Sequence, residues 1–414
     1  MNISGISASS GGKKNRWDLV LLFVGAGVVA SFQVGKAPPM LPSIRDELGM
    51  SLVLAGWVLS TFNVLGLAVG SLAGAVSDAL GHRLVLFSGL VLQAAGSIIG
   101  AFSPVASILL TTRLFEGLGF LMIASSAPVL IFKVTRPSDV RFSLAVWSCF
   151  LPAGASIIML LAPMFNSFSG WRGLWLANGA VLVLFAVFFM KKTDGMSMPE
   201  VKTSLNLKRF IGDFAGTVTS AGPLLLSFIF AAYTLQWLTV MGFLPTLLID
   251  DFGIGKGSAS IFTAVMVAVN IPGNLAGGWL MQKGIGRGKL ICTAILIMGL
   301  NSFVIYSSGL HFWIRYGGCL AFSGFGGLLP ASILSGAPVH APCSDQVGTT
   351  NGLIMQGGQL GQLVGPPVLA VLVSHTGTWQ SAPFMLFAAA LTGAGLSLIL
   401  SMKEKKMESD VTGL

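Results

Sequence analysis

Residues 74–99 of this 414-residue chain read GAVSDALGHRLVLFSGLVLQAAGSII. The second part, residues 84–99, is a nearly continuous apolar run that does not alternate between apolar and polar side chains. Alternation with a period of two marks the strand of a transmembrane β-barrel, so its absence favours a helix. The run approaches the length of about 20 residues that a helix needs to cross a bilayer. We therefore predict that residues 74–83 connect two membrane-spanning helices.

The composition extends this interpretation to the whole chain. Hydrophobic residues make up 54% of the sequence and charged residues only 9%, whereas a soluble domain carries about 25% charged residues. Because so few charged residues cannot cover a surface that faces water, we expect much of the surface to face lipid. Backbone polar groups in lipid must be satisfied within the protein, which requires helices or a closed barrel.

The spacing of the apolar runs predicts an all-α membrane protein with twelve transmembrane helices in two pseudo-symmetric six-helix bundles. The first six spans are placed at about 17–42, 51–75, 84–103, 105–132, 139–164 and 171–190. The last six are placed at about 221–249, 256–281, 288–309, 312–338, 346–374 and 378–402. The N-terminal bundle then covers 1–190, a cytoplasmic linker covers 191–220, and the C-terminal bundle covers 221–414.

The basic residues predict the orientation of the spans, because cytoplasmic loops are enriched in Lys and Arg. With the N-terminus in the cytoplasm, most of the 24 basic residues fall in cytoplasmic segments, and Arg45, Arg172 and Lys256 fall in outer ones. We therefore expect a multi-pass protein of the cytoplasmic (inner) membrane with both termini in the cytoplasm. This distribution accounts for the net charge of +9 without a nucleic-acid partner.

Short words recur between the two halves at a constant offset. Leu41-Pro42 corresponds to Leu244-Pro245, and Arg113 corresponds to Arg315, one residue out of register. Two parallel repeats of six helices are typical of one class of secondary transporter. The repeat supports a division of the chain into two bundles.

The connection after the second predicted span resembles the loop signature of the major facilitator superfamily. Its glycine, aspartate, glycine and basic positions are Gly74, Asp78, Gly81 and Arg83. We expect Gly74 to allow close helix contact. The resemblance implies that Asp78 accepts from a helix N-terminus or an arginine, as a latch between conformations.

The fourth predicted span is similar to the fourth-helix motif of the same family, which contains a buried arginine. It reads Arg113-Leu-Phe-Glu116-Gly117-Leu-Gly119. The resemblance covers the whole chain and implies alternating-access transport by two helical bundles around a central cavity. We expect Gly117 and Gly119 to permit close helix packing rather than to bind a nucleotide.

Within the superfamily, the sequence looks most like the cyanate-permease-like branch. The resemblance lies in Lys36 before Pro38-Pro39, in Trp147-Ser148, and in the Gly361–Pro366 segment. It implies transport of small anions and small polar organic molecules, although lysine replaces the usual arginine of that branch. The antiporter signature of the fifth helix is only partly met, because no glycine pair follows Ala162-Pro163. This weakens the alternative of proton-coupled drug or metabolite efflux.

Beyond the first three residues of each predicted span, four charged residues remain, and the three cations and one anion sum to +2: Lys36, Arg113, Glu116 and Arg315. A charge at the centre of a membrane helix costs roughly 2.5–3.5 kcal/mol on insertion scales, so such residues face a cavity or a partner. A cavity with a positive balance favours an anionic substrate.

Each of these charges has two interpretations. Lys36 either holds the substrate anion or extends along the helix to the outer interface. Arg113 and Glu116, one turn apart, form either a static pair or a pair that a proton on Glu116 opens to the substrate. Arg315 lies near the outer end of its span, where an interfacial anchor is an equal alternative.

Three glutamines of the eleventh predicted span share one helical stripe: Gln356, Gln359 and Gln362. They either bind substrate in the cavity or join neighbouring helices through hydrogen bonds. Gln33 of the first span is a further substrate-binding candidate. Trp147 is a candidate for the cavity wall, with helix packing or the interfacial aromatic belt as the alternative.

Several classes of chemistry are disfavoured by the sequence. It contains no GxxxxGK[ST] loop and no CxxC pair, and its four histidines fall in predicted loops or at outer ends. We therefore expect a monomeric transporter rather than an enzyme, with no cofactor or metal. Its partners would be a small anionic substrate, protons and the lipid bilayer. A non-transporting membrane receptor is the alternative from another class.

Overall fold

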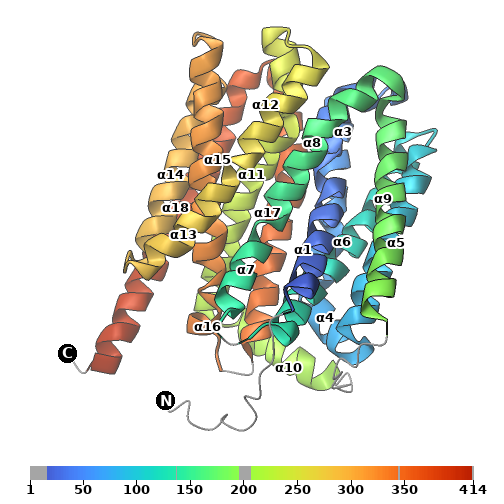
Figure 1. Cartoon of the computed structure of the whole chain (residues 1–414). Helices are drawn as coiled ribbons and strands as arrows, with labels where there is room; N and C mark the ends of the chain where they lie inside the picture. The colour runs from blue at the N-terminus through green and yellow to red at the C-terminus, as the bar shows by residue number, and fades with distance from the viewer. Residues whose placement is uncertain (1–15, 137, 195–206, 344–345, 413–414) are drawn as a thin grey trace.

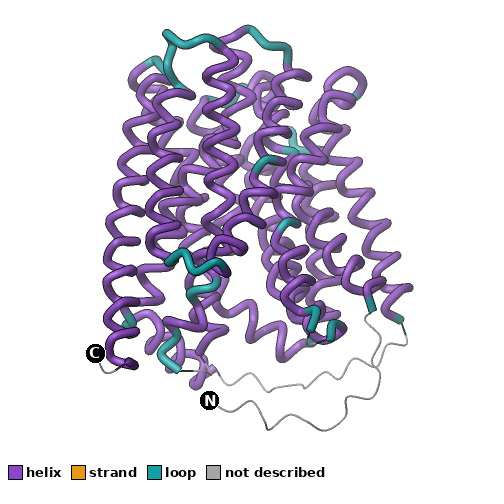
Figure 2. Tube along the Cα trace, turned by 60° about the vertical axis from the view of Figure 1, so that its left-hand side comes forward, coloured by secondary structure: helices purple, strands orange, loops and turns teal. Residues whose placement is uncertain are grey.

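The computed structural model describes residues 16–136, 138–194, 207–343 and 346–412. Every regular element in these residues is helical (Figure 2). Eleven helical stretches are long and apolar enough to cross a membrane. The predicted all-helical architecture is therefore confirmed for the described part of the chain.

The elements of the first half run from one end of the molecule to the other. They are α1 (Trp17–Gly35), α2 (Ala37–Leu48), α3 (Leu52–Ser60), η1 (Thr61–Asn63), α4 (Val64–Leu80), α5 (His82–Ala101), α6 (Ala106–Val134), α7 (Val140–Ser148), α8 (Phe150–Phe168) and α9 (Gly170–Thr193).

The second half, like the first, consists mostly of long helices joined by short connections. Its elements are α10 (Leu207–Val218), α11 (Ala221–Phe252), α12 (Lys256–Ala268), α13 (Asn270–Gln282), α14 (Arg287–Ile305), α15 (Phe312–Leu334), α16 (Ala337–His340), α17 (Val347–Thr376), η3 (Trp379–Ser381) and α18 (Ala382–Thr412).

Helices α1 and α2 together form one candidate span with a joint at Lys36. The joint lies just before Pro38-Pro39, and Lys36 between the two helices keeps helical backbone angles (φ −70°, ψ −29°). Both prolines lie in the first turn of α2, where a proline is tolerated because a backbone N–H is not needed. The joint therefore interrupts the helix at one residue without ending the span.

The connection predicted at 74–83 is mostly helix. Helix α4 continues to Leu80 and α5 begins at His82, so Gly81 alone separates them. Gly81 has a φ of +91°, a conformation open to glycine because it has no Cβ. One residue of this kind reverses the chain, which lets both helices extend to the turn.

Helix α1 begins and helix α18 ends at the same end of the molecule, at the bottom of Figure 1. Helix α6 packs on α1, α4 and α5, whereas α14 packs on α15 and α18. Contacts between the two halves join α17 to α3 and α4, α8 to α12, and α2 to α11.

Close packing around α6 depends on its glycines. A Cβ at Gly117 would lie 1.8 Å from the carbonyl oxygen of Phe62, and one at Gly119 would lie 2.5 Å from that of Gly89. The predicted role of Gly117 and Gly119 in close packing is confirmed. Their small size brings α6 against η1 and α5, and this places Arg113 and Glu116 of α6 inside the first half.

Candidate functional site

Three charged side chains meet inside the first half of the chain. One carboxylate oxygen of Glu116 accepts from Lys36 Nζ at 2.7 Å, and the other accepts from Arg113 Nη1 at 2.5 Å. The side chains of Lys36 and Glu116 are fully buried, and that of Arg113 is 2% exposed. We call Lys36, Arg113 and Glu116 the buried triad.

Lys36 reaches the triad from the joint between α1 and α2. Its Nζ also donates to Ser97 Oγ of α5 at 2.8 Å and lies 4.2 Å from the ring centroid of Trp175 of α9. The alternative in which Lys36 extends to the outer interface is wrong, because the ammonium is enclosed by α5, α6 and α9.

Arg113 is held by backbone carbonyls as well as by Glu116. Its Nη1 donates to the carbonyl of Gln33 at 2.7 Å, and its Nε donates to the carbonyl of Val58 at 3.2 Å. The guanidinium carbon lies 4.7 Å from the ring centroid of Phe62. A planar guanidinium directs its donors in fixed directions, so these contacts orient Arg113 relative to α1 and α3.

Arg315 is not part of this site. Its Nη2 donates to Asp251 Oδ2 at 2.8 Å, and its Nε donates to the carbonyl of Ile305 at 2.6 Å, both in the second half. The expected sum of +2 over one site is therefore corrected to +1 for the triad. Asp251 was missed because it lies just beyond the predicted end of its span, whereas α11 continues to Phe252.

Two glutamines that contact the triad residues, Gln33 and Gln93, carry unpartnered side-chain amide atoms. Both polar atoms of the Gln33 side chain are buried without a hydrogen-bond partner among the described residues, as is Gln93 Oε1. Gln93 Nε2 donates to the carbonyl of Glu116 at 3.1 Å. Buried polar groups are nearly always hydrogen-bonded, so these atoms suit a ligand or water molecules. Gln93 was missed, although it interrupts the apolar run at 84–99.

The glutamines of α17 lie elsewhere, at the contact between the halves. Gln356 Nε2 donates to the carbonyl of Leu67 in α4 at 2.8 Å. A Cβ at Gly66 would lie 2.8 Å from Gln359 Cδ, so that side chain packs directly on α4. Of the two predicted roles, the geometry of Gln356 matches a hydrogen bond between neighbouring helices.

The predicted latch residues have different surroundings from those expected. Arg83 Nε donates to Thr193 Oγ1 at 2.9 Å, and its Nη2 lies 4.0 Å from Asp194 Oδ1, both near the end of α9. The close contact expected at Gly74 is wrong, because no described atom would lie within 4 Å of a Cβ there. The side chain of Asp78 lies outside the part of the chain that the structure describes.

Comparison with known proteins gives a consistent assignment. The family model described as Major Facilitator Superfamily matches residues 22–342 and 226–412. The chain belongs to this superfamily. It is therefore a multi-pass membrane transporter and not an enzyme. The comparisons support the superfamily as a whole and do not single out the cyanate-permease-like branch.

Two relatives of this major facilitator protein cover most of its length. A probable sulfoacetate transporter of Cupriavidus necator is 24% identical over 379 residues, covering 87% of this chain and 88% of that one. A hexuronate transporter of Bacillus subtilis is 22% identical over 415 residues, covering 93% and 94%. A solved bacterial homologue of the human lysosomal transporter Spinster, in an inward-facing and unoccupied conformation, has a TM-score of 0.71 at 15% identity. That alignment covers 95% of this chain and 96% of the homologue.

A row of aromatic rings leads away from Arg113. Phe62 lies 5.4 Å from Phe120, Phe120 lies 5.9 Å from Phe150, and Phe150 stacks on Trp147 at 4.2 Å, all measured between ring centroids. The row runs from η1 through α6 to α8 and α7. It gives this major facilitator protein an apolar wall beside the triad, with Trp147 at its far end.

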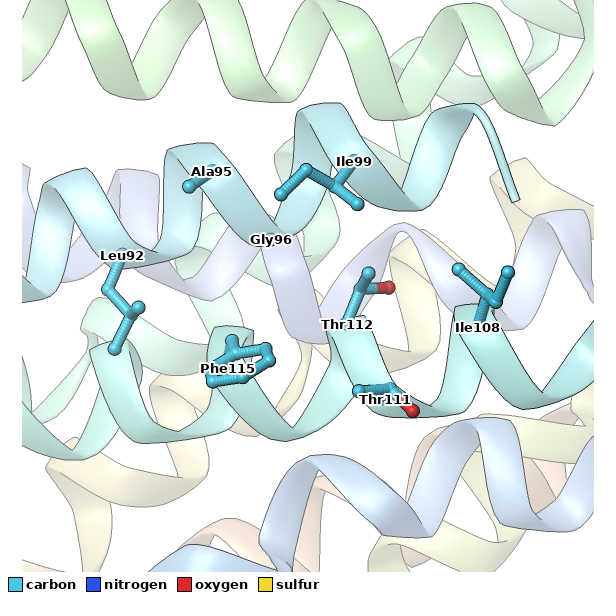
Figure 3. A pocket seen from close by; sticks show the side chains of 8 residues that line it. All are labelled: Leu92, Ala95, Gly96, Ile99, Ile108, Thr111, Thr112 and Phe115. Carbon is cyan, nitrogen blue, oxygen red and sulfur yellow. The ribbon is translucent and has the colours of Figure 1, made fainter.

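A groove of about 350 Å³ lies between α5 and α6 on another side of the triad (Figure 3). Its lining is apolar apart from Thr111 and Thr112. Gly96 separates it from the triad, because a Cβ there would lie 2.9 Å from Glu116 Cγ. Since no charged side chain lines this groove, it offers an anion no counter-charge, and the triad remains the candidate site.

Proposed function

We propose that this chain is a secondary active transporter of small anions or small polar organic compounds. It would work by alternating access and couple uptake to protons. The observation that carries the proposal is that two buried cations, Lys36 and Arg113, share the single carboxylate of Glu116. The relatives named for sulfoacetate and hexuronate support an anionic substrate.

Protonation of Glu116 provides the coupling step. A neutral carboxylic acid no longer balances the two cations, and an unbalanced buried charge is strongly unfavourable. An oxyanion of the substrate restores that balance by binding to Lys36 and Arg113. Loss of the proton to the cytoplasm returns Glu116 to the cations and releases the substrate there.

The proposed architecture has twelve spans, with α17 as the one beyond the eleven apolar stretches. At 30 residues, α17 is about 45 Å long, enough to cross a bilayer. Bundles at 1–190 and 221–414 would rock about the contacts of α17 with α3 and α4 and of α8 with α12. Residues 191–220 would form the cytoplasmic linker.

The remaining assignments complete the proposal. The protein would be a monomer in the inner membrane, with both termini in the cytoplasm. Gln33 would bind substrate beside the triad, and Gln356 and Gln359 would lie on the moving contact between halves. Gly81 would allow the tight turn between α4 and α5, and Arg83 would anchor that turn to α9. Latching by Asp78 follows from the family signature.

The test is thermal stabilisation of the purified protein by a panel of small anions, neutral analogues and lipophilic cations at two pH values. Ligands that bind the folded state raise its apparent stability. We expect anions to stabilise the protein, more so at the lower pH, and Lys36→Ala or Arg113→Ala to abolish the shift. Stabilisation by lipophilic cations alone would contradict the proposal and favour efflux.

A further inference from the structure

We propose that the buried triad exchanges one carboxylate for another at constant charge, so that one compact monoanion enters with one proton and transport is electroneutral. The inference rests on the proposed function and adds to it the charge of the substrate and the stoichiometry. It follows from a count of the charges at the site and from the way Glu116 is bound.

The charge count is simple because few ionisable groups are present. Among the described residues, the triad contains two cations and one anion, a balance of +1. The contacts from the surrounding helices are neutral. They come from the hydroxyl of Ser97 on α5, the ring of Trp175 on α9, the ring of Phe62 on η1, the carbonyls of Gln33 on α1 and Val58 on α3, and the amide of Gln93 on α5.

The geometry of Glu116 shows what kind of group can replace it. Each of its two oxygens binds a different cation, at 2.7 Å for Lys36 and 2.5 Å for Arg113. A substrate carboxylate or sulfonate also presents at least two acceptor oxygens from one centre. It can take over both cations when a proton occupies Glu116.

This exchange leaves the balance of the site unchanged. With Glu116 ionised and no substrate bound, the net charge of the site is +1. With Glu116 protonated and a monoanion bound, the net charge is again +1. A neutral substrate on protonated Glu116 would leave +2, and a dianion would leave zero. Changing the charge of a buried site that moves through a membrane is costly, so the monoanion is the substrate that the triad fits.

The unpartnered amides add a second requirement on the substrate. Gln33 lies one turn before Lys36 and its carbonyl binds Arg113, and the side chain of Gln93 donates to the backbone of Glu116. The free atoms of these amides supply both donors and acceptors. They suit a hydroxyl or similar group carried next to the oxyanion. The substrate class is therefore a compact organic monoanion with hydrogen-bonding groups.

The decisive experiment measures uptake by the full-length protein in liposomes with potassium and valinomycin to set the membrane potential. Labelled D-glucuronate is the monoanionic probe, and labelled sulfoacetate is the dianionic one. At zero potential, a gradient of one pH unit, acidic outside, should accumulate glucuronate about tenfold, because one proton enters per anion. At equal pH, a potential of about 100 mV, negative inside, should cause no accumulation.

Two results would overturn the inference alone. If two protons enter with each monoanion, the same potential alone should accumulate glucuronate roughly 50-fold, since one net charge then crosses the membrane. Sulfoacetate taken up in preference to glucuronate would show that the site takes a dianion. Either result leaves the proposed transport function intact. Failure of both probes to bind or enter overturns the proposed function and this inference together.

The variant Glu116→Gln separates the exchange of substrate across the membrane from the coupling of transport to protons. It should lose the accumulation driven by pH but keep the exchange of internal for external glucuronate, because its amide mimics the protonated acid. Asp18→Asn is the matched control, since this carboxylate is 42% exposed and lies at the opposite end of α1 from Lys36. Accumulation that persists in Glu116→Gln would refute the coupling role. If that variant does not fold, the voltage measurement on the unaltered protein still decides.

Discussion

The two halves of the chain each contain a buried arginine at corresponding positions, and the two arginines have different partners. Arg113 shares Glu116 with Lys36, and all three side chains are almost completely buried. Arg315 pairs one-to-one with Asp251, which is 29% exposed near the end of α11. One site carries an excess positive charge, and the other is balanced.

The difference indicates which arginine serves transport and which serves the structure. A balanced pair at a helix end costs little, because solvent reaches one partner and the charges cancel. An excess charge deep in a bundle is costly and is expected where transport uses it. A repeated arginine therefore takes its role from its partners rather than from its position in the repeat.

The largest expected effect concerns transport. Arg113→Ala removes one of the two cations that bind the anion, and Arg315→Ala is the matched control. Truncating one partner of a buried charge pair costs about 2–5 kcal/mol, so uptake by Arg113→Ala should fall by roughly 30-fold or more. Arg315→Ala should keep uptake within about threefold of the unaltered protein, since its partner is part-exposed. Equal losses in a liposome uptake assay would remove the distinction between the two sites.

The next effect concerns stability. Glu116→Gln leaves two cations without a counter-charge, which should lower the free energy of unfolding by about 3–5 kcal/mol. Asp251→Asn leaves the buried Arg315 with its bond to the carbonyl of Ile305 and a part-exposed amide beside it, and should cost less, about 1–3 kcal/mol. Thermal unfolding in detergent measures both. A larger loss for Asp251→Asn would place the critical charge in the second half instead.

A conservative exchange tests geometry apart from charge. Arg113 directs separate donors to Gln33, Val58 and Glu116, and a lysine cannot reproduce that fork. Arg113→Lys should therefore raise the KM for the transported anion about tenfold, a cost of about 1.4 kcal/mol. Arg315→Lys should leave KM unchanged. If Arg113→Lys behaves like the unaltered protein, charge alone suffices at this position.

The smallest effect lies outside both arginine sites. Gln356→Leu removes the hydrogen bond to the carbonyl of Leu67 between the halves, worth about 1 kcal/mol. It should change the maximal transport rate by a few-fold through the balance between conformations, while ligand affinity stays within about twofold. A selective loss of affinity, measured by ligand-induced stabilisation, would show that Gln356 belongs to the substrate site instead.

Local features of the molecule could be predicted from the sequence because they depend on neighbouring residues. The length of the apolar runs predicted the helices, with most ends correct to within a few residues. The spacing of Arg113 and Glu116 placed them on one helix face, and they form the ion pair that both interpretations contain. Gly117 was assigned to close packing for the same local reason.

Contacts between distant segments were decided by the tertiary structure. Lys36 is 80 residues from Glu116 in the chain, and their meeting depends on the joint between α1 and α2 and on the rotation of α6. Asp251 faces Arg315 because α11 continues past the apolar run that predicted its end. Hydrophobic periodicity indicates which side of a helix is apolar, but the choice of partner depends on packing between helices. For that reason, four charges in the sequence became one triad with a net charge and one separate, balanced pair.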